Sequence, residues 1–384
     1  MGRSAVTRKI RAIVLDACGC CARPYGDSAP LRVAELVLDD PQPGELLIRI
    51  DAAGLCHSDL SVVNGDRPRP MPMALGHEAT GIIEALGSSD DPVFKIGDRV
   101  VMAFLPACGE CEDCVAGESY LCGPGSRANG EGRMLRGGSR LREGDTPIKH
   151  HLGVSGFADY AVVDRCSAVK IDDDVPAEIA ALFGCAVLTG VGAVMNSAKV
   201  LPGESVVIFG LGGVGLSALL GAVASGASPI IAIDPIAAKR DLALKLGAVA
   251  AFAPAEAEAG LKAVLPRGAD VVIETAGKAA VLLAAYHAGR RGARIVTVGL
   301  PNPADMLTLP AVSLVAEGKT LIGSYMGSAV PARDIPKYIR LWKAGRLPVE
   351  HLLTSQSPLG DINQLLDALA DGSAIRQILL PQVA

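Results

Sequence analysis

The chain is poor in aromatic residues and contains no long block of like charges. Of its 384 residues, Phe, Trp and Tyr make up 3%, and Asp, Glu, Lys and Arg make up 20%. The formal net charge is −5, and no basic cluster offers a footprint for nucleic acid or for an anionic membrane surface. We therefore expect neither nucleic acid nor a membrane among its partners.

We also expect no cleavable secretion signal. The apolar run after Arg11 stops at Asp16, and no small-residue cleavage site ends it. The uncharged stretch from Ser205 to Ile233 has the length of a membrane span, but six glycines interrupt it. A parallel strand buried on both faces and a buried helix give the same hydropathy, so we expect a protein of the cytoplasm without a membrane span.

Apolar residues and cysteines, by contrast, are plentiful. Half of the residues are hydrophobic, and the length exceeds that of one ordinary domain, which indicates two domains. The chain has ten cysteines. Without a secretion signal, so many cysteines indicate metal binding or catalysis rather than disulfides.

The pattern of apolar runs changes along the chain. Up to Val101, short apolar runs cut by Pro, Gly and Asp predict a mostly β region. The polar, glycine-rich segment from Gly123 to Gly153 lacks periodicity and predicts a long loop. From Ser205 onward, apolar runs alternate with helix-like stretches, which predicts a parallel, doubly wound sheet of the α/β class. We expect a first domain over residues 1–187, a second over 188–325, and a return of residues 326–384 to the first.

Four cysteines stand close together with the spacing C-x2-C-x2-C-x7-C: Cys108, Cys111, Cys114 and Cys122. Four thiolates complete the tetrahedral coordination of zinc and leave no open position for a substrate, so the pattern indicates a structural zinc site. An iron–sulfur cluster is the main alternative, since its ligands also come in such runs.

A catalytic zinc needs about three protein ligands and an open fourth position. The candidates are Cys56, His77 and Cys185. Each is weak evidence by itself, because a single cysteine is usually a small buried apolar residue.

A dinucleotide site is indicated by Gly210, Gly212 and Gly215, which form G-x-G-x-x-G between a strand-like and a helix-like run. Asp234 follows Gly215 by nineteen residues, at the end of the next strand, where an acid binds the ribose hydroxyls. The carboxylate would repel a 2′-phosphate, which favours NAD over NADP.

Several tracts resemble the zinc-containing medium-chain alcohol dehydrogenases over almost the whole chain. Residues 76–81 (GHEATG) with Gly87 resemble the zinc signature of that family, and the cysteine loop has its spacing. Residues 210–215 and 137–140, with Pro147, Ile148 and His150, resemble the branch of the liver-type and glutathione-dependent formaldehyde dehydrogenases.

The resemblance implies a mostly-β GroES-like catalytic domain, a Rossmann coenzyme domain and two zinc ions per chain. It implies that Cys56, His77 and Cys185 bind the catalytic zinc and that Glu78 lies near the metal. Asp59 is the expected acceptor for the second ring nitrogen of His77. Arg376 either pairs with Glu78 or reaches the cofactor phosphates. Further cofactor contacts are expected from His57, Thr189, Gly213, Val214, Lys239 and Val298.

The implied reaction is hydride transfer between an alcohol and NAD, giving an aldehyde or ketone. Ser58 matches the hydroxyl that starts the proton relay of the family, but Ser61 stands where the relay histidine is expected. We therefore expect the proton to pass from Ser58 through the ribose to water or to His57.

By the same resemblance, Phe104 and His151 are the expected substrate-pocket residues. Many members of the family have an aromatic apolar residue at the position of His151, so we expect a more polar pocket than is usual for the family. The expected substrate is a primary or aromatic alcohol, which can also carry a polar group. The alternative is a formaldehyde dehydrogenase that acts on a thiol adduct of the S-hydroxymethyl type. The apolar segment from Thr320 to Met326 is a candidate edge strand for a homodimer.

Overall fold

A division after Cys185 separates the chain into two units in the computed structural model, which describes residues 7–383. Unit 1 contains the described residues up to Cys185, Val330–Pro336 and the segment from Leu353 onward. Unit 2 contains Ala186–Ala329 and Lys337–Leu352. The return toward unit 1 is therefore interrupted, unlike the single return expected from residue 326. Residues 337–352 stay with unit 2 because their short helix η5 (Val349–Leu352) packs against helix α7 (Gly213–Ala224).

Unit 1 is mostly β, as the short apolar runs predict. Five strands close a barrel in the order β1 (Arg8–Leu15), β2 (Leu31–Leu38), β7 (Leu141–Glu143), β8 (Thr146–His150) and β4 (Met73–Ala74). A seven-stranded sheet has the order β10 (Ala168–Lys170), β6 (Arg99–Met102), β5 (Ala79–Leu86), β3 (Glu45–Leu55), β18 (Arg376–Leu379) and β17 (Leu353–Ser357), with β9 (Tyr160–Asp164) also paired to β3. Two apolar clusters fill this unit.

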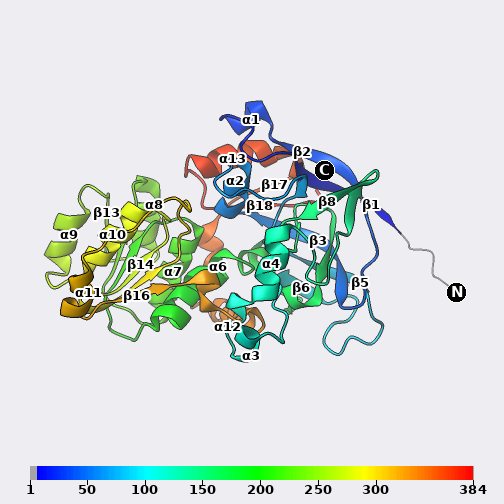
Figure 1. Cartoon of the computed structure of the whole chain (residues 1–384). Coiled ribbons are helices and arrows are strands. Elements are labelled where there is room, and N and C mark those ends of the chain that lie inside the picture. The colour runs from blue at the N-terminus through cyan, green and yellow to red at the C-terminus, as the bar shows by residue number, and fades with distance from the viewer. Residues whose placement is uncertain (1–6, 384) are drawn as a thin grey trace. The chain divides into compact units, whose positions relative to one another are not determined.

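The helices of unit 1 are short and lie in the connections between strands (Figure 1). They are α1 (Tyr25–Ser28), α2 (His57–Val63), α3 (Glu112–Val115), α4 (Gly123–Glu131), α5 (Ala177–Leu182) and α13 (Ile362–Ala370), with the 3-10 turns η1 (Ser119–Leu121), η2 (Arg165–Ser167) and η6 (Leu359–Asp361).

The prediction of a long loop over residues 123–153 is wrong. Helix α4 begins after the N-cap Cys122, with a proline in its first turn, and ends at Gly132 in the left-handed conformation. Strands β7 and β8 then form an antiparallel pair whose Leu141 and Ile148 side chains join an apolar cluster. The pair is too short to show a clear alternation of apolar and polar residues in the sequence.

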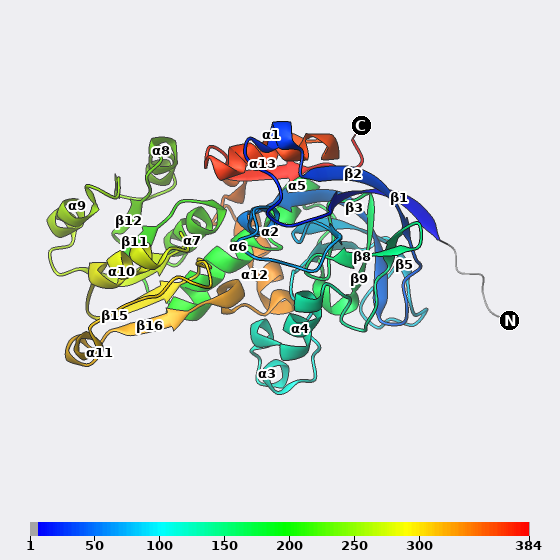
Figure 2. The same cartoon turned by 45° about the horizontal axis from the view of Figure 1, so that its top comes forward.

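Unit 2 contains a six-stranded sheet whose paired strands all run parallel, in agreement with the predicted class (Figure 2). The order is β13 (Ala250–Phe252), β12 (Ile230–Ile233), β11 (Val206–Phe209), β14 (Ala269–Glu274), β15 (Gly289–Thr297) and β16 (Thr320–Gly323). The helices are α6 (Ala186–Gly192), α7 (Gly213–Ala224), α8 (Ala237–Lys245), α9 (Ala257–Val264), α10 (Ala279–Ala288) and α11 (Ala311–Glu317), with the π-helix η3 (Ala193–Ala198) and the turn η4 (Tyr325–Ser328). Helix α12 (Pro331–Lys343) spans the division between the units.

Helices α9 and α10 contribute to the apolar cluster on one face of the sheet, where they meet side chains such as Val207, Ile231 and Val272. Strand order reverses at β11, whose neighbours are β12 and β14, so the turn after β11 lies at the switch point of the sheet. Ligands of such sheets bind outside the carboxyl ends of the strands at this point. Among residues 7–383, every helix falls short of the length and apolarity that a membrane crossing would need.

The barrel contains a buried histidine that should make stability depend on pH. His150, the last residue of β8, is buried, and its Nε2 accepts a hydrogen bond from the backbone N–H of Arg140 at 3.1 Å. Burial, aided by the charge of Arg140, lowers the pKa of His150 to about 3.

The unfolded chain therefore binds the proton first, and stability should fall as the pH drops below the ordinary histidine pKa of about 6.5 toward 3. Relative to pH 8, the contribution of this histidine to the free energy of unfolding should be smaller by about 2 kcal/mol at pH 5. Urea unfolding of wild type and His150→Gln at several pH values measures it. Equal pH dependence in the two proteins would contradict this assignment.

Candidate metal centres and dinucleotide site

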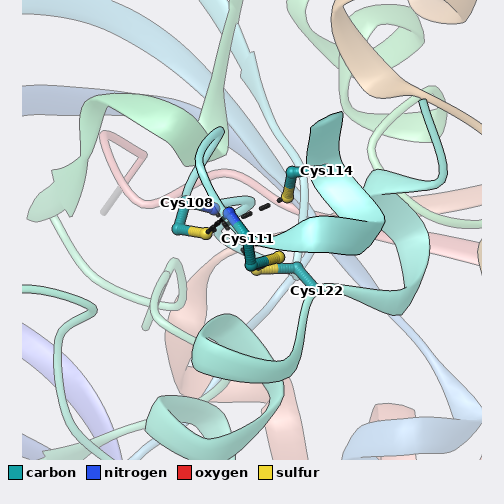
Figure 3. A group of neighbouring side chains, drawn as sticks. All are labelled: Cys108, Cys111, Cys114 and Cys122. Atoms are coloured by element: carbon teal, nitrogen blue, oxygen red, sulfur yellow. Dashed lines mark hydrogen bonds between the residues drawn. The ribbon is translucent and has the colours of Figure 1, made fainter. Parts of the chain in front are cut away.

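The four cysteines predicted to bind a structural zinc lie in one lobe of unit 1, and their side chains point toward one another (Figure 3). Sγ of Cys108 is 4.0 Å from Sγ of Cys114, and Sγ of Cys111 is 3.9 Å from Sγ of Cys122. A zinc–sulfur distance of about 2.3 Å in a tetrahedron requires sulfurs about 3.8 Å apart. The cluster has the spacing that a zinc site with four cysteine ligands needs.

Backbone N–H groups favour thiolates in this lobe. Cys111 donates to Sγ of Cys108 at 3.3 Å, and Cys108 and Gly125 donate to Sγ of Cys122 at 3.3 and 3.4 Å. A hydrogen bond from the backbone of Cys114 contributes most to lowering the pKa of Cys111, to about 7. Burial raises the pKa of Cys114 to about 12 and also raises that of Cys122, where the backbone N–H groups oppose the shift. Such donors stabilise the charged form of sulfur that binds a metal.

A second buried group brings together side chains that are far apart in the sequence. Ligand atoms of Cys56, His77, Glu78 and Cys185 all lie within 4.8 Å of one another. Cys56 lies between β3 and α2, His77 and Glu78 precede β5, and Cys185 follows α5. The three predicted zinc ligands are therefore close enough to share one ion.

The ring of His77 has one free nitrogen and one bound nitrogen. Its Nδ1 is 3.1 Å from Oδ1 of Asp59, whereas its buried Nε2 has no hydrogen-bond partner. A buried nitrogen without a partner is costly unless something binds it, and a metal would. The expected pairing of Asp59 with His77 also fixes the tautomer that leaves Nε2 available for a metal.

Asp59 serves the local backbone as well. Its Oδ2 accepts the N–H of Cys56 at 3.0 Å, and the two residues form the capping box that begins α2. Fixing the first turn of this helix thus also fixes the positions of Cys56 and Ser58.

Charges around the group are balanced by Arg376, which is buried. Its Nη1 lies 3.4 Å from Oε2 of Glu78 and 3.3 Å from the carbonyl oxygen of Leu55, so it makes the first of the two contacts considered for it. Burial raises the pKa of Glu78 to about 7 although Arg376 opposes the shift. Oε1 of Glu78 is buried and unpartnered, and a Cβ at Gly54 would lie 2.4 Å from it, so only glycine leaves room for this carboxylate.

The acidity of Cys56 follows from its neighbours. A hydrogen bond from Cys185 contributes most, with Arg376 and His77 adding to it, and together they lower the pKa of Cys56 well below its ordinary value despite burial. Burial opposes a charge on His77, but Asp59 and Cys56 raise the pKa of His77 well above its usual range. Negative groups therefore surround this ring, an arrangement that favours a cation.

The residues of the expected proton relay lie on α2. Ser58 is half-buried, and its Oγ is 3.9 Å from Sγ of Cys56. His57 is exposed at the start of the helix. The hydroxyl of Ser61, at the position expected for the relay histidine, donates to the carbonyl oxygen of His57 at 2.9 Å and so is bound within the helix.

The two expected pocket residues both meet the ring of His77 edge to face. The centroid of Phe104 is 5.7 Å away at an interplanar angle of 85°, and that of His151 is 5.4 Å away at 80°. His151 is buried, and its Nδ1 is 3.2 Å from Oδ1 of Asp59. The contact between His151 and Asp59 was not foreseen, because no local motif links residues so far apart in the sequence.

In unit 2, the glycine-rich turn joins β11 to α7. Gly210 has φ +90°, and a Cβ at Gly215 would lie 1.8 Å from the carbonyl oxygen of Gly210, so strand and helix approach too closely for a side chain. A Cβ at Gly212 would meet no atom within 4 Å. This open space at the N-cap of α7 suits the close approach of a pyrophosphate, with Gly213 and Val214 in the first helical turn.

Asp234 follows β12, and its two oxygens accept the backbone N–H groups of Leu211 and Ile236 at 2.7 and 2.8 Å. Each oxygen keeps a second lone pair for a ribose hydroxyl. Nη1 of Arg240 donates to the carbonyl oxygens of Asp234 and Pro235. Lys239 is buried on α8, and burial lowers its pKa although Asp234 opposes the shift.

The remaining predicted cofactor residues also lie in unit 2. Thr189 is buried on α6, and Val298, directly after β15, donates its backbone N–H to the carbonyl oxygen of Glu274 at 2.8 Å.

A parallel sheet with a glycine-rich turn at its switch point, together with a buried Cys–His–Cys group in the other unit, defines a metal-containing, dinucleotide-dependent dehydrogenase. Comparison with known proteins is consistent with this class. Residues 42–173 match the alcohol dehydrogenase GroES-like domain, and residues 213–344 match the zinc-binding dehydrogenase family.

Similar proteins align over nearly the full length. A putative alcohol dehydrogenase D of Mycobacterium tuberculosis is 38% identical over 91% of this chain and 96% of its own. An S-(hydroxymethyl)glutathione dehydrogenase of Escherichia coli is 34% identical over 92% of this chain and 97% of its own. The crystal structure of benzyl alcohol dehydrogenase from Acinetobacter calcoaceticus has a TM-score of 0.90 at 32% identity, covering 97% of this chain and 99% of that one.

The chain therefore belongs to the zinc-containing medium-chain alcohol dehydrogenase family. It is a zinc-dependent alcohol oxidoreductase that uses a nicotinamide cofactor.

The surroundings of Gly215 and Gly212 predict different effects of the same substitution to alanine. Gly215→Ala forces a methyl group against backbone and should destabilise the protein by roughly 1–3 kcal/mol. Gly212→Ala should leave stability within about 0.5 kcal/mol of wild type but weaken NADH binding about tenfold or more, a cost of about 1.4 kcal/mol. Thermal unfolding and NADH fluorescence titration separate the two effects. Unchanged NADH affinity in Gly212→Ala would place the pyrophosphate elsewhere.

Proposed function

We propose that the chain is an NAD-linked dehydrogenase that oxidises primary or aromatic alcohols to aldehydes, with one zinc held by Cys56, His77 and Cys185 and a second held by the four cysteines of the lobe. The convergence of two buried thiols on the unpartnered Nε2 of His77 carries the proposal. Three such ligands leave zinc an open position, whereas the four cysteines would leave none.

When bound, zinc supplies the Lewis acidity that lowers the pKa of an alcohol, and the nicotinamide accepts the hydride. The protein contributes the ligand field. Asp59 keeps the proton of His77 on Nδ1, so Nε2 is the nitrogen that can bind zinc. Arg376 offsets the charge of Glu78 and thereby limits the negative charge of the buried group.

Ser58 is proposed to take the proton from the alcohol, because its hydroxyl lies beside the ligand sulfur of Cys56 at the start of α2. With the cofactor bound, water or His57, at the exposed start of the same helix, would be the final acceptor of that proton by way of the cofactor ribose. The hydroxyl of Ser61 is hydrogen-bonded to the helix backbone, which argues against a relay through this residue.

A preference for NAD is supported by Asp234, whose buried carboxylate stands where a ribose 2′-phosphate would need a cation. Arg240 is a basic candidate on α8, but its Nη1 is hydrogen-bonded to two backbone carbonyl oxygens. Lys239 is the proposed partner of the ribose.

An aromatic or short primary alcohol is the preferred substrate. Phe104 offers an apolar ring next to His77, and the similar crystal structure is of a benzyl alcohol dehydrogenase. The polar ring of His151 also packs edge to face against the ring of His77. The thiol-adduct alternative rests on the 34% identical relative named S-(hydroxymethyl)glutathione dehydrogenase.

A homodimer is proposed because β16 is the edge strand of the sheet in unit 2 and apolar side chains lie exposed before and on α11, among them Met306, Val312 and Val315. Sedimentation velocity tests this proposal. Wild type should sediment as a dimer and Val315→Lys as a monomer, and monomers in both would contradict the proposal.

A location in the cytoplasm is proposed because both sets of ligand cysteines require reduced thiols.

Metal analysis of matched variants tests the two-zinc proposal. Wild type should contain two zinc ions per chain, and Cys56→Ser and Cys111→Ser should each lose one of them. Only Cys56→Ser should abolish NAD-dependent oxidation of benzyl alcohol while leaving the fold intact, whereas Cys111→Ser should lower the melting temperature.

Substrate turnover and zinc content together distinguish the proposed function from its alternatives. Oxidation of formaldehyde that requires added glutathione, without turnover of benzyl alcohol or short primary alcohols, would replace the proposed substrate class. One zinc in wild type, unaffected by Cys56→Ser, would overturn the catalytic site itself.

Removal of the Ser58 hydroxyl tests the proton route. Ser58→Ala should lower kcat by about 10² to 10⁴, because a positioned proton-transfer group contributes that much. Ser58→Thr should retain much of the rate, and Ser61→Ala, as the matched control on the same helix, should change it little. Steady-state kinetics with benzyl alcohol provide the measurement, and an unaffected rate in Ser58→Ala removes Ser58 from the relay.

A further inference from the structure

Asp59 has two histidines on one oxygen. Its Oδ1 lies 3.1 Å from Nδ1 of His77 and 3.2 Å from Nδ1 of His151, while its Oδ2 is taken by the N–H of Cys56. All three side chains are buried. A carboxylate removed from water needs polar partners, and within the described part of the chain no second carboxylate belongs to this Asp59–His77–His151 group.

The contact of His151 differs from that of His77. Nδ1 of His77 has hydrogen-bond geometry toward Asp59, whereas Nδ1 of His151 lies at a similar distance but outside the hydrogen-bonding angle. The edge-to-face packing of the two rings, 5.4 Å apart, brings them together on this oxygen. His151 is thus a second ring beside the carboxylate, which it contacts electrostatically rather than through an aligned hydrogen bond.

The backbone after β8 is strained where it positions this side chain. Leu152 and Ser155 both have positive φ, +52° and +51°, a conformation that non-glycine residues rarely adopt. Oγ of Ser155 accepts the backbone N–H of His151 at 3.0 Å and donates to the carbonyl oxygen of Ala74 at 2.9 Å. Strain of this kind persists where the surrounding structure requires it, commonly at functional sites.

We propose that His151 is a positioning residue for the catalytic metal, holding Asp59 in place so that Asp59 in turn fixes the ring of His77. The inference rests on the proposed zinc site and extends it by one residue. An apolar ring at this position would fill the same space but leave Oδ1 of Asp59 with His77 alone. Residues that support metal ligands in this way typically change metal affinity 10- to 100-fold when removed.

Two variants separate the contribution of the His151 ring from that of its nitrogen, and a third serves as a control. His151→Phe keeps a ring of similar size and loses the nitrogen, whereas the amide nitrogen of His151→Asn is as many bonds from Cα as Nδ1 is. His150→Phe is the matched control, since His150 is the adjacent buried histidine and binds the backbone of Arg140 instead of Asp59.

The measurements are the rate at which a chelator removes the catalytic zinc from the holoenzyme and the visible spectrum after cobalt replaces that zinc. His151→Phe should lose the metal about tenfold faster and shift the cobalt bands. His151→Asn should lie close to wild type in both, and His150→Phe should leave both unchanged.

Three results would overturn the inference while leaving the zinc site standing. If His151→Phe releases its metal as slowly as wild type and has the same cobalt spectrum, Asp59 needs no second ring to hold it in place. Equal defects in the Phe and Asn variants would assign the effect to packing. Selective loss of a third metal equivalent in His151→Phe would make His151 a ligand instead of a positioning residue. Absence of any zinc removable by Cys56→Ser would remove the proposed function, and this inference with it.

Discussion

Oδ2 of Asp59 accepts the backbone N–H of Cys56, and Oδ1 meets Nδ1 of His77. One buried carboxylate therefore sets the first turn of α2, the backbone position of Cys56 and the tautomer of His77, which are two of the three proposed zinc ligands. Loss of this carboxylate would disturb the helix start and the metal site together. The constraint explains why the chain keeps a charge at a position with no access to solvent.

Around this carboxylate, the charges alternate in sign. Arg376 offsets Glu78, Cys185 and Arg376 favour the thiolate of Cys56, and the anions around His77 favour a cation at its free nitrogen. Neutral apolar side chains would pack more cheaply in the same volume. The group of charged side chains is stable only when each charge is offset, which fits the proposed binding of a divalent ion as the last member of the group.

The sequence predicted the fold class because its signals are local and periodic. Runs such as Ile230–Ile233 form parallel strands, and the spacing of Gly210, Gly212 and Gly215 matches the strand–turn–helix that the structure contains. The segment over residues 123–153 was mispredicted, since a short helix and two short strands leave little periodicity. Contacts such as that of Asp59 with His151 depend on the closing of the barrel, and no local pattern encodes them.

The two candidate metal groups differ in how their ligands are distributed along the chain. Cys108 to Cys122 span fifteen residues, whereas Cys56, His77 and Cys185 are drawn from three distant segments. Closing a short loop costs little chain entropy, so the four cysteines could bind their proposed ion before the strands of unit 1 have assembled. The other group exists only once β3, β5 and α5 are assembled. If both groups bind zinc as proposed, a newly made chain would fill the four-cysteine group first and the Cys56–His77–Cys185 group last, once folding has brought its ligands together.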